Sequence, residues 1–452
     1  MSSSSHTFDV LVVGAGPAGI AAACSAAESG VRVALLDNNP RLGGQIWRGQ
    51  PQSHPANPDA RKWFEKFAAA HIEFLPSTEV IDHLENGHVV VHRIDGQRVG
   101  AQSIDELPEE VHELAYKKLI LCTGARELFL PFPGWTLPNV MGAGGLQALV
   151  KSGLLVSGKK VVVAGSGPLL LAVAAHLREH GADVRLVAEQ APWPRVARFA
   201  MSLLLQKTKL AQAFEIKRQL SGVPYKTNCW PVRANGNGEN AKLESVTLRS
   251  GSRTWQERCD YLACGFHLVP NTELAALLRC ELRAGFVRVD DSQQTSVRDV
   301  FCAGEPTSIG GVNLAIVEGQ IAGYAAVGQS ASAAKLLPEK RRLDRFAVLL
   351  RETFALREEL RSAVDSETIV CRCEDVKFGR VGQHSSWRAA KLHTRCGMGP
   401  CQGRICGPAT QFFFGWKADS VRPPVFAASM QSLAVAVAVQ TEEHLMSHEE
   451  SR

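Results

Sequence analysis

Residues 8–37 read FDVLVVGAGPAGIAAACSAAESGVRVALLD and establish the fold class. The apolar run Phe8–Val13 predicts a buried parallel strand. The small residues from about Ala18 to Ser29 predict a helix that packs closely on this strand. A second apolar run, Val31–Leu36, predicts the next strand and ends on Asp37. Because this is a complete βαβ unit, we expect an α/β protein.

The turn between the first strand and the helix carries three glycines with the spacing G-x-G-x-x-G. Gly14 allows a tight turn, and Gly16 lets main-chain N–H groups approach a pyrophosphate. Gly19 lets the helix pack closely on the strand. Asp37 lies 18 residues past Gly19 and is placed to bind ribose hydroxyls. The turn in this context predicts a dinucleotide site.

A second βαβ unit begins at Lys160, and its turn sequence, GSGPLL at 165–170, lies 151 residues after the first glycine turn. Strands are expected over Val161–Ala164 and Val184–Ala188, and a helix over Leu169–His180. Leu170 replaces the third glycine of the fingerprint, and Glu189 at the second strand end would repel the 2′-phosphate of NADP. Two interpretations stay open: an NAD site, or, as these departures favour, a domain kept for packing.

Composition excludes several other classes of protein. Of the 452 residues, 45% are hydrophobic and 21% charged, which argues against extensive disorder. The net charge of +5 comes from interspersed charges, so no nucleic-acid partner is expected. The start has no signal-peptide pattern, and the apolar run Ser432–Val439 is too short to cross a membrane. We therefore expect a cytoplasmic protein, with any membrane association made through its electron acceptor.

Further strand endings complete a pattern around the first unit. PRLGGQ at 40–45 follows Asp37, and the apolar run Leu119–Cys122 ends in Thr123-Gly124-Ala125. SVRDVFCAGE at 296–305 is followed by Gly310-Gly311 and a predicted helix over Val312–Ala326. From residue 8 to about 330 the chain resembles the flavoproteins with two dinucleotide-binding domains, which include thioredoxin reductase-like and glutathione reductase-like enzymes.

This resemblance implies FAD at the first site. In the family a Gly-Asp pair holds the ribityl-phosphate region of the flavin, and the next helix directs its N-terminus at the isoalloxazine. Glu305 is one methylene longer than that aspartate. The fingerprint and the resemblance together predict a cofactor site formed by Gly14, Gly16, Pro17, Ala18, Gly19, Asp37, Asn38, Arg41, Gly43, Gly44, Gln45, Val80, Thr123, Gly124, Gly304, Glu305, Gly311 and Val312.

Five of the twelve cysteines lie between Cys371 and Cys406. Four thiolates suit a [2Fe–2S] cluster or a tetrahedral zinc ion. The Cys371-Arg-Cys373 spacing is tighter than the usual zinc knuckle and favours the cluster. The glycine-rich loop at 397–403 offers main-chain N–H groups to sulfur atoms. No closely spaced cysteine pair is placed for disulfide reduction beside a flavin.

The motifs IVCRCEDV at 369–376 and TRCGMGPCQGRIC at 394–406 resemble the [2Fe–2S] domain of the bacterioferritin-associated ferredoxin type. The order of domains resembles the α-type subunits of opine oxidases and of dye-linked proline or hydroxyproline dehydrogenases, and the corresponding B subunit of hydrogen cyanide synthase. This resemblance implies the ligands Cys371, Cys373, Cys401 and Cys406, with Cys396 as a spare or neighbouring thiol.

The same resemblance implies a division of labour between subunits. A β-type flavoprotein, similar to D-amino-acid oxidase or sarcosine oxidase, would oxidise an amine or amino acid. This chain would relay electrons towards a respiratory acceptor, with FMN at a subunit interface and a small third subunit in some relatives. The first site would hold FAD, or only ADP or ATP. The alternatives are a stand-alone NADH-dependent ferredoxin or quinone reductase, and a scaffold that holds zinc and a nucleotide.

The residues themselves identify no general base, so the catalytic residues are unknown; His267 is the histidine best placed to approach a flavin. We expect a first domain over 8–128 and 295–335, an inserted domain over 155–294, a helical connector over 336–364, a small α-rich cysteine domain over 365–425 and a tail over 426–452. A helix over Pro58–Phe74 and a hairpin over Leu84–Ala101 are also expected.

Overall fold

The computed structural model describes residues 6–50, 55, 57–84, 87–93, 111–203, 207–238, 242–417, 421–428, 430 and 433. The chain forms two compact units. The first unit comprises Met1–Ala125, Pro270–Ala347 and Ser420–Arg452, and the second comprises Arg126–Val269 and Val348–Asp419. The second unit contains the predicted inserted domain only as far as Val269, because residues 270–294 belong to the first unit. It also contains the predicted cysteine domain as far as Asp419, and the predicted connector is divided between the units.

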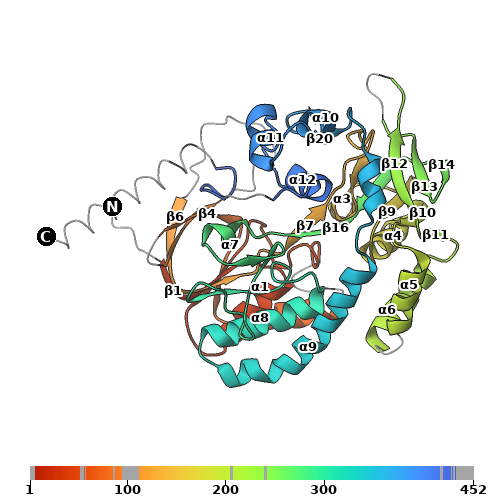
Figure 1. Cartoon of the computed structure of the whole chain (residues 1–452). Helices are drawn as coiled ribbons and strands as arrows, with labels where there is room; N and C mark the ends of the chain where they lie inside the picture. Colours follow the sequence, from red (N-terminus) through yellow and green to blue (C-terminus); the bar gives the residue numbers. More distant parts are fainter. Residues whose placement is uncertain are drawn as a thin grey trace. The chain divides into compact units, whose positions relative to one another are not determined.

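A mixed sheet forms the centre of the first unit, as Figure 1 shows. Its strands follow one another in the order β3 (Ile72–Leu75), β2 (Val33–Leu36), β1 (His6–Val13), β6 (Val111–Leu121), β5 (His88–Arg93) and β4 (Thr78–Leu84), and β19 (Val300–Cys302) also pairs with β6. The strands β1, β2, β3, β6 and β19 are parallel to their neighbours in this set. Because Val13 pairs with both Leu36 and Leu121, the segments after these three strands meet at one edge.

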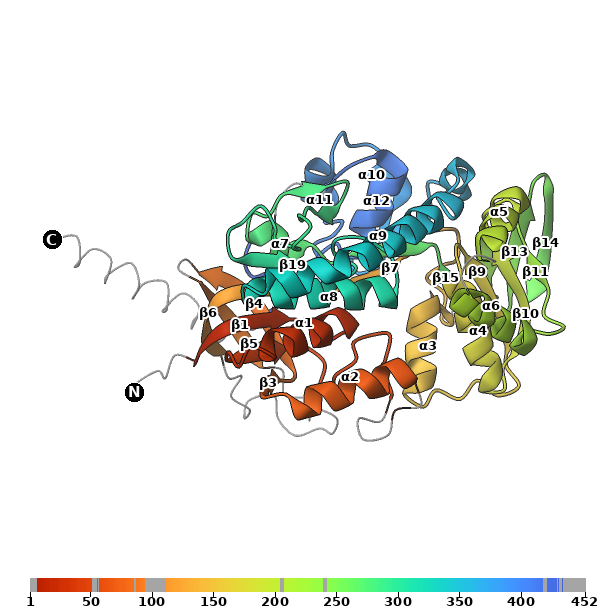
Figure 2. The ribbon, with the colours of Figure 1, turned by 90° about the horizontal axis from the view of Figure 1, so that it is seen from below.

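Two helices of the first unit, α1 (Pro17–Ala27) and α8 (Val312–Ala326), lie side by side in Figures 1 and 2. Glycines allow this close approach: a Cβ on Gly319 would lie 2.1 Å from the Ala18 carbonyl oxygen, and one on Gly323 would lie 2.3 Å from that of Ala22. The unit also contains α2 (Pro58–Ala69), α7 (Glu273–Leu277), the strand pair β17 (Leu282–Arg283) and β18 (Phe286–Val287), and the start of α9 (Ser330–Thr353).

The second unit is built on a parallel sheet with the order β11 (Tyr225–Lys226), β10 (Asp183–Glu189), β9 (Lys160–Gly165), β15 (Tyr261–Gly265) and β8 (Val140–Gly142). Its helices are α3 (Ala143–Lys151), α4 (Leu169–Glu179), α5 (Trp193–Leu203) and α6 (Lys207–Gln219). An antiparallel sheet of β12 (Trp230–Asn235), β13 (Ser245–Ser250) and β14 (Arg253–Arg258) follows. The chain passes between the units at β7 (Ala125–Leu128), at β16 (His267–Pro270) and within α9.

The cysteine-rich part of the second unit is small and mostly helical, as predicted. It contains the 3₁₀ helix η1 (Glu358–Ala363), the pair β20 (Ile369–Cys371) and β21 (Val376–Lys377), and the helices α10 (Phe378–Val381), α11 (Trp387–Thr394) and α12 (Cys406–Phe414). The helices α10, α11 and α12 lie together in Figures 1 and 2, and the core of this part includes Val370, Trp387 and Cys396. In contrast, η1 packs on β12 through Leu360. Ser386 caps α11 by accepting a hydrogen bond from the Ala389 N–H.

Some expected elements differ from the observed ones. The helix expected to reach Phe74 ends at Ala69, because the apolar residues from Ile72 onwards pair as β3 with β2. The connector helix begins earlier than expected and ends at Thr353, with a separate 3₁₀ turn after it. Glu85 and Asn86 of the first turn, the second turn of the hairpin expected over 84–101, and most of the predicted tail lie outside the described residues. No helix among the described residues is long and apolar enough to cross a membrane.

Candidate functional site

The first glycine turn has the shape that a pyrophosphate requires. A Cβ on Gly19 would lie only 1.7 Å from the Gly14 carbonyl oxygen, so the start of α1 packs directly against the turn. In contrast, a Cβ on Gly16 would meet nothing within 4 Å among the described atoms. The second glycine therefore presents an open face beside the N-terminus of α1, where an anion is favoured by the helix dipole.

Asp37 lies at the end of β2 with its carboxylate directed at the turn. One oxygen accepts the Ala15 N–H at 2.6 Å, and the other accepts the main-chain N–H of Asn39 at 2.7 Å. Arg48 in turn donates to the Asn39 side chain. The pairing of β1 with β2 thus brings the predicted ribose-binding acid to the glycine turn, while Asn39 and Arg48 support it.

Other predicted residues border the same turn. Gly44 approaches so closely that its Cβ would lie 2.9 Å from the Gly16 Cα, and the Gly43 N–H donates to the Ala15 carbonyl. The Thr123–Gly124 segment is fixed by Asn271, which donates from Nδ2 to the Thr123 carbonyl at 2.9 Å and from its main-chain N–H to Gly124.

Gly304 and Glu305 reach the site from β19. A Cβ on Gly304 would lie 2.9 Å from the Ala18 Cβ, so this turn lies against the start of α1. Burial raises the pKa of Glu305. Gly311 and Val312 begin α8, and Gly311 also has open space around its Cα. The N-terminus of α8 is therefore exposed and accessible to a ligand.

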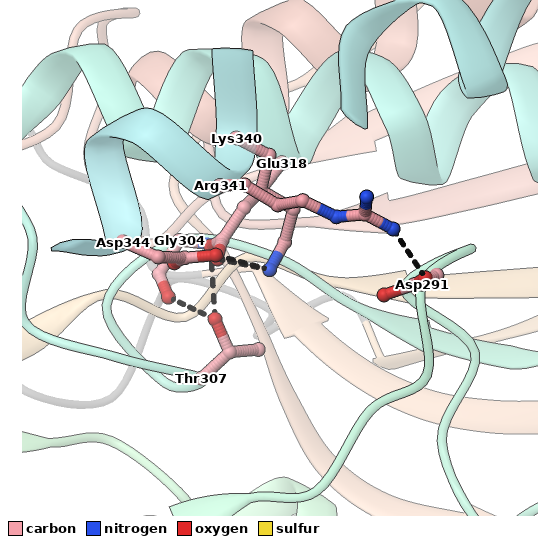
Figure 3. A network of polar contacts seen from close by, with 7 residues as sticks. All are labelled: Asp291, Gly304, Thr307, Glu318, Lys340, Arg341 and Asp344. Carbon is pink, nitrogen blue, oxygen red and sulfur yellow. Dashed lines mark hydrogen bonds and ion pairs between the residues drawn. The ribbon is translucent and has the colours of Figure 1, made fainter. Parts of the chain in front are cut away.

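A buried carboxylate holds the Gly304 turn in place (Figure 3). Glu318 of α8 accepts the Gly304 N–H at 2.8 Å and the Thr307 hydroxyl at 2.9 Å. Lys340 lies 3.8 Å from the same carboxylate and 3.0 Å from Asp344. Burial raises the pKa of Glu318 to about 7 despite these partners. Glu318 was not among the residues predicted from the sequence, although a single acid within the small apolar helix is a visible signal.

The remaining predicted cofactor residues have different surroundings. Pro17 occupies the first turn of α1, which its fixed φ suits. Asn38, Arg41 and Gln45 are exposed, and Asn38 donates to Glu79. The Val80 side chain packs in the core beneath the sheet, so only its main chain can face a ligand.

The open face at Gly16, the carboxylate of Asp37 and the two helix N-termini together fit a dinucleotide such as FAD.

The second glycine turn repeats the first, including the acid after its second strand, but a segment of the same chain lies beside its second glycine. Glu189 is fully buried and accepts the N–H groups of Gly167 at 2.7 Å and Ala191 at 2.8 Å. Burial raises the pKa of Glu189 to about 7. Leu170 is also fully buried, and Gly265 leaves room for it. The space over Gly167 is lined by the ring of Phe354, 3.8 Å from an added Cβ.

The cysteine cluster forms in the second unit at the end of β20 and the start of α12. The sulfur atoms of Cys371, Cys396 and Cys406 lie within 4.8 Å of one another, and all three residues are buried. Cys401 is half-buried and hydrogen-bonds with Cys406 and Cys373, which is exposed. The close group therefore contains two of the predicted ligands, Cys371 and Cys406, together with Cys396, which was predicted as a spare thiol. The other two predicted ligands, Cys373 and Cys401, lie beside this group and outside the 4.8 Å set.

Hydrogen bonds set the protonation pattern of these thiols. Those from Cys396, Cys406 and the Gly397 N–H lower the pKa of Cys371 to about 2, although burial opposes this. The bond from Cys406 lowers the pKa of Cys401 to about 5, whereas the bond to Cys371 raises the pKa of Cys396 to about 12. The expected donation from the glycine loop to sulfur is present, since the Gly397 N–H lies 3.5 Å from Cys371. The donor set fits a [2Fe–2S] cluster or zinc.

The cysteine cluster is anchored to the rest of its unit. The Trp135 indole N–H donates to the Ile369 carbonyl at 2.6 Å, at the start of the strand that ends on Cys371. Arg126 donates to the Arg404 carbonyl at 3.1 Å, within the loop between Cys401 and Cys406.

The cysteines outside the cluster are all buried, and burial raises the pKa of thiols such as Cys122, Cys264 and Cys302. His267 is half-buried, and burial lowers its pKa.

Comparisons with known proteins agree with this fold. Residues 8–324 match the family model described as pyridine nucleotide-disulphide oxidoreductase. The HcnB subunit of hydrogen cyanide synthase from Pseudomonas aeruginosa is 33% identical over 432 residues, covering 88% of this chain and 90% of the relative. The A subunit of opine oxidase from Rhizobium meliloti is 30% identical, covering 88% and 80%. The L-proline dehydrogenase structure from P. horikoshii has the same fold, with a TM-score of 0.62 and 19% identity over 96% of this chain and 80% of that one.

Proposed function

The chain belongs to the pyridine nucleotide-disulphide oxidoreductase family, in the group that includes the HcnB subunit of hydrogen cyanide synthase and the A subunit of opine oxidase, and on this basis we propose its function. It is the electron-transferring subunit of a multi-subunit dehydrogenase for an amine or amino acid of the opine, proline or hydroxyproline type. It receives electrons from a partner flavoprotein and passes them to a respiratory acceptor. The names of both relatives, which identify them as subunits, support this proposal.

The buried thiol group in the second unit carries the proposal. Cys371, Cys396 and Cys406 offer sulfur atoms within 4.8 Å of one another in an apolar core, and Cys401 adds a thiol whose pKa is lowered to about 5. Thiolates are the ligands of iron–sulfur clusters, and the Gly397 N–H donates to one of them. Cys371, Cys373, Cys401 and Cys406 are the proposed ligands, with Cys396 as the neighbouring thiol.

The first unit holds the nucleotide in this proposal. Asp37, which accepts the Ala15 N–H of the glycine turn, is the proposed partner of the ribose hydroxyls, and the open face of Gly16 is proposed for the pyrophosphate. FAD is the proposed ligand, and ADP or ATP is the alternative. When bound, a flavin and a [2Fe–2S] cluster supply the conversion of two-electron oxidation into one-electron transfer. Glu318 and Asn271 keep the surrounding turns rigid for this purpose.

Substrate oxidation is assigned to the partner. His267, the histidine expected to be best placed for a flavin, bonds instead with the adjacent Leu268 main chain. A β-type flavoprotein similar to D-amino-acid oxidase is the proposed partner, with FMN at the interface. The competing function, a stand-alone NADH-dependent reductase, requires a working second dinucleotide site, and the ring of Phe354 over Gly167 argues against one.

Reconstitution with the partner tests the proposal. The chain and a candidate β-type flavoprotein from the same organism are purified together without oxygen, and candidate opines, proline and D-hydroxyproline are added. The expected result is reduction of this chain's visible chromophore by one of these substrates, in the presence of the partner and not in its absence. Cys401→Ser should abolish that reduction, while Cys264→Ser should not. Reduction by substrate without any partner would contradict the proposal.

A further inference from the structure

The second glycine turn meets a segment of its own chain at the point where a dinucleotide would approach. In the fingerprint, the second glycine has no side chain so that a pyrophosphate can come close to the main chain. Here that glycine is Gly167, and the atoms nearest to its added Cβ are Cγ and Cβ of Phe354, at 3.8 and 3.9 Å. At the equivalent glycine of the first turn, Gly16, nothing lies within 4 Å among the described atoms. One turn is open and the other is covered.

Hydrogen bonds hold this segment on the turn through its main-chain carbonyls. The Ser166 hydroxyl, between the two turn glycines, donates to the Phe354 carbonyl at 2.8 Å. Gln190, one residue past the end of β10, donates to Ser166 at 2.8 Å and to the Ala355 carbonyl at 3.2 Å. Ser166 and Gln190 are both buried. Because β9 and β10 end at this edge, the segment lies where ligands of such sheets bind.

Arg357 completes the attachment. Its main-chain N–H donates to the Gln190 side chain at 3.2 Å, and its guanidinium donates to the Gln190 carbonyl at 3.3 Å and to Asn228. The same guanidinium lies 4.0 Å above the Trp230 ring. Phe354 itself is 5% exposed and packs edge-on against Phe199. Polar and apolar contacts therefore fix both ends of the segment.

We propose that the second dinucleotide-binding domain holds the Phe354–Arg357 segment of its own chain in place of a coenzyme. The segment leads directly into η1 and the cysteine domain, so the domain serves as an anchor for the cysteine cluster. The second dinucleotide-binding domain takes no electrons from NADH or NADPH. This inference goes beyond the proposed function, since it concerns a domain to which that function assigns no ligand. A pyridine nucleotide does not fit the residues present at this turn.

Amide hydrogen exchange of the full chain, with and without NADH, tests this inference. Peptides covering 165–170 and 354–358 report the two sides of the contact. Ser166→Ala removes the hydroxyl that donates to the Phe354 carbonyl and accepts from Gln190, and it should speed exchange at 354–358 at least about tenfold. The matched control is Ser362→Ala, because the Ser362 hydroxyl donates to the Glu359 carbonyl at 2.7 Å, outside the reporting peptide. In that variant, exchange at 354–358 should stay within about twofold of the unaltered chain.

NADH should leave exchange at 165–170 unchanged in the unaltered chain. Slower exchange at 165–170 on adding NADH, with faster exchange at 354–358, would show that coenzyme displaces the segment and would overturn the inference. Equal exchange at 354–358 in Ser166→Ala and the unaltered chain would also overturn it. NADH binding at the first turn is recognised separately, by slower exchange at 14–19. Iron content, which tests the proposed function, does not enter this experiment.

Discussion

Replacing Glu318 with glutamine tests how the first site is held together. The carboxylate accepts hydrogen bonds from Gly304 and Thr307, and an amide oxygen can accept both. The substitution therefore keeps the acceptor and removes the titration. Burial raises the pKa of Glu318 from 4.5 to about 7, so between these pH values the folded chain binds a proton that the unfolded chain does not. The stability of the unaltered chain should therefore fall as pH rises through this window.

The size of the effect follows from that change in pKa. Raising a pKa from 4.5 to about 7 corresponds to about 3 kcal/mol. The free energy of unfolding of Glu318→Gln, minus that of the unaltered chain, should rise by about this amount between pH 4.5 and about pH 8. The ion pair with Lys340, 3.8 Å away, forms only when Glu318 is ionised, so its effect is already contained in this pKa. Exchange protection of the α8 amides, corrected for intrinsic rates, measures this difference.

Glu28→Gln is the matched control on the neighbouring helix. Burial would raise the pKa of Glu28, but hydrogen bonds from Lys66 and Tyr324 outweigh it and lower the pKa. Glu28 therefore stabilises the fold above its usual pKa and loses this effect in acid, so its variant should lose stability relative to the unaltered chain as pH rises. A pH-independent difference for Glu318→Gln, or one of the same sign in both variants, would show that burial of Glu318 does not set its pKa.

Three further predictions concern the site and its anchors. Gly19→Ala should lose the bound nucleotide, because the new Cβ would lie 1.7 Å from the Gly14 carbonyl oxygen. The amount of nucleotide released on denaturation measures this loss, and an amount equal to that of the unaltered chain would contradict the prediction. Cys401→Ser should lose its iron while Cys264→Ser, in the apolar core, keeps it; iron analysis decides, and equal iron in both would contradict the ligand set. Trp135→Phe should destabilise the second unit by about 1–3 kcal/mol, since it leaves the carbonyl at the start of β20 without its donor; denaturant unfolding measures this, and an unchanged midpoint would contradict it.

The sequence predicted the features that depend on local pattern. The βαβ unit from Phe8 to Asp37, the repeated turn at Gly165 and the helical cysteine domain are all present, because apolar strands and glycine turns act over short distances. Pairing of β1 with β2 then places the Asp37 carboxylate beside the glycine turn, as the sequence of the βαβ unit predicts. The fold class and the first glycine turn could therefore be predicted well.

Features that depend on distant contacts were not predicted. Phe354 covers Gly167 although 187 residues separate them, and no pattern in the segment 354–357 indicates this. Likewise, the sequence motif and the resemblance leave Cys396 out of the predicted ligand set. The loop after α11 nevertheless folds so that the Cys396 sulfur lies beside those of Cys371 and Cys406. Which of the five thiols act as ligands stays a prediction. The end of α2 at Ala69 was missed because β3 is decided by pairing with β2.

The metal and sulfide content of the chain is the decisive measurement for the proposed electron-transfer role. The chain is purified alone and without oxygen, and iron, zinc, acid-labile sulfide and flavin are measured on one sample, followed by addition of NADH. We expect about two iron atoms and two sulfides per chain, and a visible spectrum that NADH does not bleach. Zinc without sulfide, or rapid bleaching by NADH, would contradict that role.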